Sequence, residues 1–160
     1  MIRFIAALDN KRGIADEHGI PWQGKIPTDV AHFRKSTIHG IVMMGYGWYV
    51  EQKLPLPERR NLVATTNSEE LRAGFERVTD ARTFLQETKE DVWVGGGAGL
   101  FASTIDLADE LVLTLIEADF RCTKFFPPYE DAFELVESSA VIVESGISYR
   151  FTRWSRRNTL

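Results

Sequence analysis

The sequence predicts an α/β fold: a mostly parallel, twisted β-sheet with flanking helices and an antiparallel edge strand near the C-terminus. Short apolar runs rich in strand formers alternate with segments of helical periodicity along the first two thirds of the chain, as in parallel sheets covered by helices. The last third changes to strand-like segments joined by a short turn at residues 144–147, which is typical of an antiparallel pair. With 160 residues, the chain is expected to form a single domain over residues 1–160.

Each predicted strand is a short apolar run bounded by turn residues. The predicted strands cover residues 2–8, 41–44, 61–65, 77–78, 91–94, 110–116, 133–143 and 148–154. The predicted helices begin at capping residues or follow a turn. The first runs from Thr28, as its N-cap, to a stop at Gly40. The others cover residues 69–73, a segment that Thr79 caps, and residues 100–105.

The composition indicates an ordinary globular protein. Its 44% hydrophobic and 26% charged residues are typical of soluble domains. The net charge of −4 argues against a nucleic-acid binder with a broad basic field. No apolar run approaches the roughly 20 residues that span a bilayer, and the first residues do not resemble a signal peptide. The single cysteine, Cys122, fits a reducing compartment, so we expect a cytoplasmic protein.

The most informative stretch covers residues 20–34, where a proline-punctuated loop becomes a helix. Asp29 falls in the first helical turn, and Phe33, four residues later, lies on nearly the same face. One interpretation is that Asp29 simply favours the helix N-terminus, where a negative charge interacts well with the dipole. The other is a functional carboxylate beside an aromatic ring.

A second candidate is the triple glycine at residues 95–97, which follows a predicted strand and precedes a predicted helix. Such a turn exposes backbone N–H groups to an anion, usually phosphate, at a sheet edge where α/β proteins bind ligands. It is neither a Rossmann fingerprint, since Leu100 stands at the third glycine position, nor a Walker loop. The alternative is a tight turn that only glycine can make.

Two weaker signals accompany these segments. Thr65, Thr66 and Asn67 follow another strand and offer hydroxyls and N–H groups to the same ligand. Arg59, in a proline-rich loop, is a candidate clamp for a carboxylate because guanidinium binds it in a bidentate manner. A solvated loop arginine is the default interpretation of that residue.

The sequence gives no sign of metal or serine-nucleophile chemistry. The three histidines, His18, His32 and His39, lack ligand spacing and a cysteine group. No Gly-x-Ser-x-Gly elbow is present. No metal site is predicted.

Taken in order, these segments resemble dihydrofolate reductase of the chromosomal bacterial type over nearly the full chain. The motifs that carry the resemblance are Ile5-Ala6-Ala7, Gly13-Ile14, Ile20-Pro21-Trp22, Pro27-x-Asp29-x-x-x-Phe33-Arg34, Val42-Met43-Met44-Gly45, residues 54–61 (LPLPERRN), the Gly-Gly segment, Leu113-Thr114 and Phe126-Pro127. The resemblance implies reduction of 7,8-dihydrofolate to tetrahydrofolate with NADPH, and binding of antifolate inhibitors.

By that resemblance Asp29 and Trp22 are the catalytic side chains. Asp29 would accept hydrogen bonds from the pterin N3–H and 2-amino groups and promote protonation of N5, while Arg59 would bind the glutamate α-carboxylate. Residues 13–22 would form a loop that closes over the nicotinamide. The implied substrate contacts are Ile5, Ala6, Asp29, Val30, Phe33, Arg34, Leu56, Arg59 and Thr114. The implied cofactor contacts are Ala7, Ile14, Ile20, Gly45, Tyr46, Gly47, Trp48, Thr65, Thr66, Gly96, Gly97, Ala98, Gly99, Leu100 and Phe101.

The sequence departs from the family pattern on the cofactor side. Tyr46 stands where the family commonly has an arginine that contacts the 2′-phosphate, so use of NADH beside NADPH stays open; Arg77 or Lys124 are candidates to compensate. Trp48 replaces a usual threonine, and Ala15 a usual glycine in the mobile loop. At the glycine cluster, Gly95 replaces a branched apolar residue and Phe101 a tyrosine, so a hydrophobic wall of the pterin and nicotinamide site is expected to be missing.

Two other functions stay open at this point. One is a reductase of the same fold that acts on another heterocycle, such as a pyrimidine of riboflavin biosynthesis. The other is a catalytically weakened folate- or nucleotide-binding protein, which the departures at Tyr46, Trp48 and Gly95 motivate. Asp29, Phe33 and Arg59 favour folate reduction. We expect a monomer that binds small molecules and neither nucleic acid nor membrane.

Overall fold

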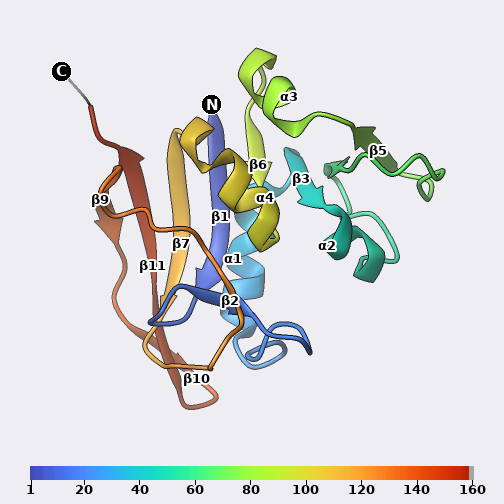
Figure 1. Cartoon of the computed structure of the whole chain (residues 1–160). Coiled ribbons are helices and arrows are strands. Elements are labelled where there is room, and N and C mark those ends of the chain that lie inside the picture. Colours follow the sequence, from blue (N-terminus) through green and yellow to red (C-terminus); the bar gives the residue numbers. More distant parts are fainter. Residues whose placement is uncertain (159–160) are drawn as a thin grey trace.

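The computed structural model describes residues 1–158. Within that part of the chain, nine strands form one sheet in the order β10–β11–β7–β1–β6–β3–β4–β5, and β9 also pairs with β11. Figure 1 shows the strands nearest the C-terminus at one side of the molecule and β5 at the other. This architecture confirms the predicted α/β class with a mostly parallel sheet and an antiparallel edge.

The parallel part of the sheet runs from β7 to β5. Its strands are β1 (Ile2–Leu8), β3 (Ile41–Gly45), β4 (Arg60–Ala64), β5 (Phe75–Val78), β6 (Val92–Val94) and β7 (Glu110–Ile116). β1 lies between β6 and β7, and its residue Ala7 pairs with Thr114 of β7. Because all six strands point the same way, their carboxyl ends share one edge, where such sheets bind ligands.

The antiparallel edge contains β9 (Phe133–Ser138), β10 (Ile142–Glu144) and β11 (Ile147–Arg156). The prediction of one strand over residues 133–143 was wrong, because β9 and β10 pair with different parts of β11. Ser139 breaks the segment: its N–H donates to the carbonyl of Phe151, and its hydroxyl accepts from the Phe151 N–H. A second, small sheet joins β2 (Gly13–Ala15) and β8 (Lys124–Phe125), both too short for a sequence pattern to reveal.

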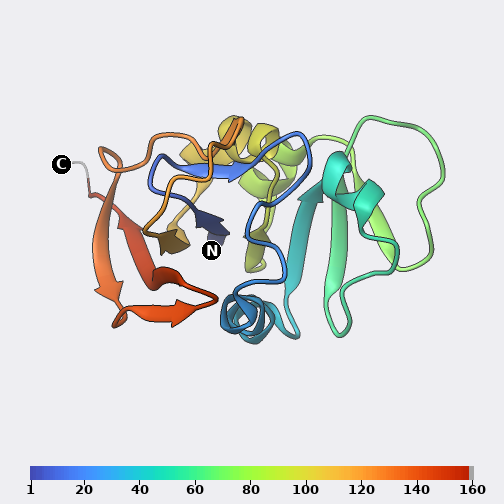
Figure 2. The same ribbon diagram turned by 90° about the horizontal axis from the view of Figure 1, so that it is seen from below.

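Helices cover both faces of the sheet: Figure 2 shows α1 on one face and α3 and α4 on the other. The helices are α1 (Pro27–Thr37), α2 (Tyr46–Glu51), α3 (Ala81–Glu87) and α4 (Ala98–Thr104), and a single 3₁₀ turn, η1 (Ile105–Leu107), follows α4. Helix α2 was not predicted, since Tyr46-Gly47-Trp48 has low helix propensity. Helix α4 begins at Ala98, two residues earlier than expected.

Both predicted ends of α1 were wrong. Thr28 does not cap the helix: the N-cap is Ile26, and the Thr28 N–H and hydroxyl both donate to the carboxylate of Glu144 on β10, at 3.1 and 2.5 Å. The helix ends at Thr37, and the left-handed residue beyond it is His39, with φ of 64°, rather than Gly40.

Two predictions further along the chain also need correction. Asp80, and not Thr79, caps α3 by accepting from the Thr83 N–H at 3.0 Å. The helix expected over residues 69–73 does not form. Instead Arg72 holds that segment against α2, since its guanidinium donates to the carbonyls of Tyr49 and Gln52.

The hydrophobic core has a main cluster between the sheet and helices α3 and α4. Phe4, Phe101 and Phe126 form its aromatic centre, with ring centroids 4.9–6.4 Å apart. A second cluster, around Trp22 and Tyr149, lies beside β7 and β11. These clusters fix the positions of the strands and helices whose ends surround Asp29 and the glycine turn.

Candidate active site

Asp29 lies in the first turn of α1, next to β7. The hydroxyl of Thr114 on β7 donates a hydrogen bond to Asp29 Oδ1 at 2.6 Å. Burial raises the pKa of the Asp29 carboxyl, and the charge of Glu144 adds to this, while the Thr114 hydrogen bond and His32 act in the opposite direction. The net result is a carboxyl that holds its proton at a higher pH than an exposed one.

The floor beside this acid is formed by β1. Ile5 is buried, whereas Ala6 and Ala7 are partly accessible, and Ala7 pairs directly with Thr114. The structure therefore brings Asp29, Thr114 and the predicted contacts of β1 together. Val30, which follows Asp29 on α1, is 63% exposed and lies at the outer side of this group.

Phe33 and Arg59 lie together toward the C-terminal end of α1. The Arg59 guanidinium lies 5.9 Å from the centre of the Phe33 ring, a distance typical of a cation–π contact. It donates to Thr37 Oγ1 at 3.1 Å and to the carbonyl of Pro57 at 2.9 Å. Among residues 1–158 it forms no ion pair, so its charge is available to an anion. Burial and the neighbouring Arg34 lower the pKa of Arg59.

The loop that carries Arg59 is held by Asn61, a buried residue that sequence reasoning missed. The Asn61 side chain accepts from the Leu56 N–H at 2.8 Å and donates to the carbonyls of Leu56 and Arg59. A buried asparagine near the start of an apolar strand is the signal that could have revealed this role. Arg34, by contrast, is exposed and forms an ion pair with Glu58 at 3.4 Å.

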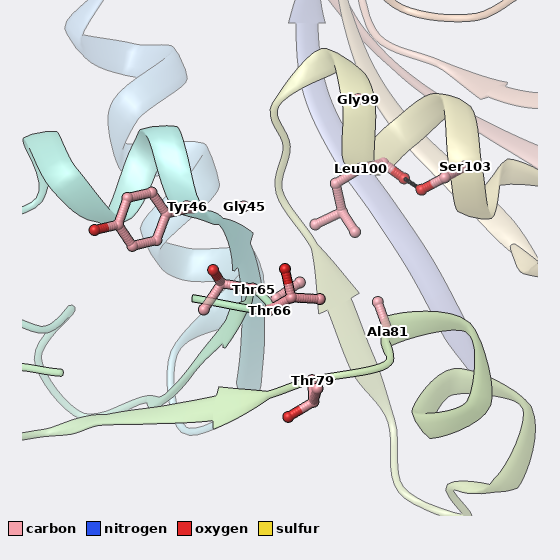
Figure 3. A pocket seen from close by; sticks show the side chains of 10 residues that line it. Gly45, Tyr46, Thr65, Thr66, Thr79, Ala81, Gly99, Leu100 and Ser103 are labelled. Carbon is pink, nitrogen blue, oxygen red and sulfur yellow. Dashed lines mark hydrogen bonds between the residues drawn. The ribbon is translucent and has the colours of Figure 1, made fainter. Parts of the chain in front are cut away.

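An open cleft of about 420 Å³ lies at the carboxyl ends of β3, β4 and β5, beside the start of α4. Figure 3 shows the hydroxyls of Thr65, Thr66, Thr79 and Ser103 and the ring of Tyr46 around it. The lining residues are Gly45, Tyr46, Ala64, Thr65, Thr66, Thr79, Ala81, Gly99, Leu100 and Ser103, and none of them is charged. Arg77 and Lys124, the two candidate cations, do not line the cleft, and Arg77 donates to the Glu69 carbonyl.

The glycine turn joins β6 to α4 next to this cleft. Gly95 N–H donates to the Met43 carbonyl at 3.0 Å, and the Gly96 carbonyl accepts from the Gly45 N–H at 2.7 Å, so the ends of β3 and β6 are tied together. Gly96 has φ of 111°, a conformation that favours glycine. Gly97 is the N-cap of α4, and Ala98 and Gly99 are its first residues.

Phe101 does not lie where the sequence placed it. It is 1% exposed and belongs to the main core, with its ring beneath Gly96: a Cβ on Gly96 would lie 3.1 Å from the Phe101 ring. Phe101 therefore supports the glycine turn from below and does not line the cleft. Gly47, also predicted on this side, is exposed in α2.

Residues 13–22 begin as β2, which places Ile14 against the main core, and continue into turns. Ile20 is 47% exposed, whereas Trp22 is 4% exposed and packs on Phe120 with ring centroids 5.2 Å apart. The segment is thus anchored at both ends, with exposed residues between them.

A polar network that sequence reasoning missed fixes the start of α1. Glu144 accepts from Thr28 and also from the Tyr149 hydroxyl at 2.5 Å. His32, one turn along from Asp29, stacks on Phe151 with ring centroids 3.9 Å apart. We call Thr28, Glu144 and Tyr149 the edge network. Its partners come from distant parts of the sequence, so no local pattern announces it.

In the part of the chain that the structure describes, no group of three His, Cys, Asp or Glu side chains is placed to hold a metal ion. The helices of residues 1–158 are all too short or too polar to cross a membrane.

An acid with a raised pKa and a glycine-rich cleft at one edge of the sheet define an α/β enzyme that binds small molecules. The family model for dihydrofolate reductase matches residues 1–156. The chain belongs to the dihydrofolate reductase family, as the sequence resemblance predicted.

Curated and solved relatives agree with this assignment. A dihydrofolate reductase of Bacillus subtilis (strain 168) is 29% identical over 99% of this chain and 96% of its own length. One from Staphylococcus aureus is 32% identical over 80% of this chain and 79% of its own. The structure of dihydrofolate reductase from Enterococcus faecalis, complexed with NADP(H) and RAB-propyl, superposes with a TM-score of 0.87 at 25% identity, covering 99% of this chain and 97% of that one.

Proposed function

We propose that this chain reduces 7,8-dihydrofolate to 5,6,7,8-tetrahydrofolate in an NADPH-dependent reaction. The observation that carries the proposal is the carboxyl of Asp29, held by Thr114 and given a raised pKa by burial, in a chain of the dihydrofolate reductase family. When bound, NADPH supplies the hydride that C6 of the pterin accepts; the proton goes to N5.

Asp29 is proposed to bind and orient the pterin. Its carboxylate accepts hydrogen bonds from the N3–H and 2-amino groups of the substrate, and Thr114 fixes which way the carboxylate faces. Because the pKa of the carboxyl is raised, the site takes up a proton near neutral pH more readily than an exposed aspartate would, which promotes protonation at N5.

The remaining substrate contacts are assigned by their positions around Asp29. Ile5, Ala6 and Phe33 would offer apolar surface to the pterin and aminobenzoyl rings. The exposed Val30 and Arg34 and the half-buried Leu56 would contact the rest of the substrate. Arg59, whose guanidinium is free of carboxylate partners within residues 1–158, is proposed to bind the α-carboxylate of the glutamate tail.

The residues of the open cleft fit a dinucleotide. Thr65, Thr66 and the backbone N–H groups of the turn at Gly96 and Gly97 suit phosphate oxygens. Gly45, Tyr46, Gly47, Ala98, Gly99 and Leu100 would surround them, and Ala7, Ile14, Ile20 and Trp48 would contact the nicotinamide end. Trp22, fixed against Phe120, is proposed to help exclude water from the reacting atoms.

The two alternative functions are not favoured. A reductase for a riboflavin-type pyrimidine would not need the Arg59 site, and a binding-only protein would not need a buried acid. The family match covers residues 1–156 and so includes both features.

We further propose that residues 1–160 form one domain and that the protein acts as a monomer in the cytoplasm, with dihydrofolate and antifolate inhibitors, but not nucleic acid, as ligands. The continuous sheet, the net charge of −4 and the single cysteine support these assignments.

The test follows dihydrofolate-dependent oxidation of NADPH and of NADH in parallel, with the Asp29→Asn variant alongside. Turnover with NADPH that falls about 10²–10⁴-fold in the variant is expected if Asp29 assists the proton transfer. Absence of turnover with both cofactors in the folded, unaltered protein would contradict the proposal. The exposed Asp131→Asn variant is the matched control and should leave the rate unchanged.

A further inference from the structure

The backbone of Gly95 and the indole of Trp48 are in direct contact. A Cβ atom placed on Gly95 would lie 2.6 Å from Cζ3 and 3.1 Å from Cη2 of Trp48. The shorter distance is one that real side chains do not adopt. The indole therefore occupies the space into which a side chain at position 95 would project. The sequence predicted that a hydrophobic wall would be missing at Gly95, and Trp48 of α2 supplies apolar surface there.

Trp48 also reaches the opposite side of the substrate site. Its ring lies 6.1 Å from that of Phe33 on α1, with the planes at 63°, an edge-to-face arrangement. Phe33 in turn contacts Arg59. The indole thus extends from the glycine turn, on the cofactor side, to the aromatic ring proposed to pack on the substrate.

The indole is only partly buried, so part of its surface is accessible to a ligand. Tyr46 and Trp48 pack against the cluster of Met44, Tyr49, Val63 and Phe75, which fixes the position of α2. A partly exposed tryptophan held on a rigid helix gives a large apolar contact at low entropic cost.

We infer that Trp48, made possible by Gly95, is a specificity-determining residue that forms the wall where the aryl part of the substrate meets the nicotinamide. The inference rests on the proposed function, which supplies the identity of the substrate. The inference also links two departures from the family pattern, Gly95 and Trp48. The side-chain volume that is absent at position 95 is present at position 48.

Such an exchange predicts energetic coupling between the two positions. Trp48→Thr removes the wall and leaves a gap beside Gly95. Gly95→Ile places a side chain where the indole lies and displaces it. The double variant Trp48→Thr/Gly95→Ile supplies the wall from the other position, and should lie closer to the unaltered protein than either single variant does.

The experiment measures kcat and the KM for dihydrofolate and for NADPH in the unaltered protein, the two single variants and the double variant. We expect Trp48→Thr to raise the KM for dihydrofolate roughly tenfold, with a smaller effect on kcat, and the double variant to recover most of it. Trp93→Phe is the matched control, because Trp93 packs with Arg3 at 5.5 Å, outside the site. An unchanged KM in Trp48→Thr, or a double variant as impaired as the worse single variant, would overturn the inference.

A second readout does not depend on turnover or on Gly95→Ile folding. Dihydrofolate added without cofactor should quench tryptophan fluorescence in the unaltered protein and in Trp93→Phe, and quench it less in Trp48→Phe, in which the emission of Trp22 remains. Equal quenching in both variants would reject contact with Trp48. If the unaltered protein shows this quenching but no turnover, the proposed reductase activity fails while the binding wall stands.

Discussion

The proposed substrate half of the candidate site, around Asp29, is made of side chains, whereas the proposed cofactor half, around the glycine turn, is made mainly of backbone and hydroxyl groups. The substrate half contains two groups with shifted pKa values, Asp29 and Arg59. The cleft of the cofactor half is lined by no charged residue among those described. In the proposed function, substrate orientation and proton chemistry are therefore assigned to the first half, and the shape of the cofactor site to the second.

The largest effect is expected when the carboxyl of Asp29 is removed. The turnover rate should fall, whereas the stability at neutral pH should rise. Because the Asp29 pKa is raised in the folded protein, its stabilising contribution is present at low pH and is lost as the pH rises from the ordinary value of 3.8 through the raised one. Asp29→Asn should therefore be more stable than the unaltered protein at neutral pH, by on the order of 1 kcal/mol, while losing turnover. Thermal unfolding at pH 7 and at pH 3 measures this.

The stability gain should vanish at the lower pH, since both chains are then neutral at this position. A gain of equal size at both pH values would show that the pKa of Asp29 is not raised. Asp131→Asn again controls for the loss of one surface charge.

The next effect is expected at Arg59. Arg59→Lys keeps the charge but loses the fork that binds a carboxylate in a bidentate manner. The KM for dihydrofolate should rise about tenfold or more, with little change in the KM for NADPH. A substrate analogue without the glutamate tail should be reduced equally well by both proteins. If that analogue is also affected, Arg59 acts through Phe33 rather than on the tail. Arg150→Lys, at an exposed ion pair with Glu117, is the control.

A smaller effect is expected when charge is added to the cofactor half. Tyr46→Arg places a guanidinium at the cleft, where it can pair with the 2′-phosphate of NADPH but not with NADH. The ratio of kcat/KM for NADPH to that for NADH should rise about tenfold. Val50→Arg, on the same helix and at a 53% exposed position, should leave the ratio unchanged. An unchanged ratio in Tyr46→Arg would place the 2′-phosphate elsewhere.

The smallest effect concerns the edge network. The charge of Glu144 raises the pKa of Asp29, so Glu144→Gln should lower that pKa and move the alkaline decline of kcat to lower pH. The rate at neutral pH should change by less than about fivefold. A pH–rate profile measures the shift, and Glu137→Gln, at an exposed ion pair with Arg153, serves as the control. A shift toward higher pH would contradict the assigned direction.

The same contrast explains what the sequence could predict. The apolar runs at β1 and β7 predicted both strands with their observed bounds, since burial on both faces leaves a local signal. The position of Asp29 on a helix beside Phe33 was also visible in the spacing. Contacts between distant segments were not: Glu144 with Thr28, or Trp48 with Gly95, depend on which elements the fold brings together.

Some predictions that rested on the chemistry of a single side chain were wrong for a similar reason. Thr28 has the chemistry of an N-cap, but the helix already begins at Pro27, so Thr28 lies inside the first turn. Its N–H and hydroxyl both donate to the Glu144 carboxylate. Gly40 is a natural helix stop, but the turn is made by His39. Phe101 occupies the place of a family tyrosine, and its burial beneath Gly96 becomes visible only once the sheet is assembled.

The backbone construction of the glycine turn has a consequence for how resistance to inhibitors would arise. A compound that binds the N–H groups near Gly96 and Gly97 relies on atoms that every amino acid except proline possesses, so nearly all single substitutions leave them in place. A Cβ at Gly96 would also crowd the Phe101 ring, 3.1 Å away, and many replacements there would harm the protein itself. Compounds that depend on Thr114 or Trp48 offer mutation an easier target.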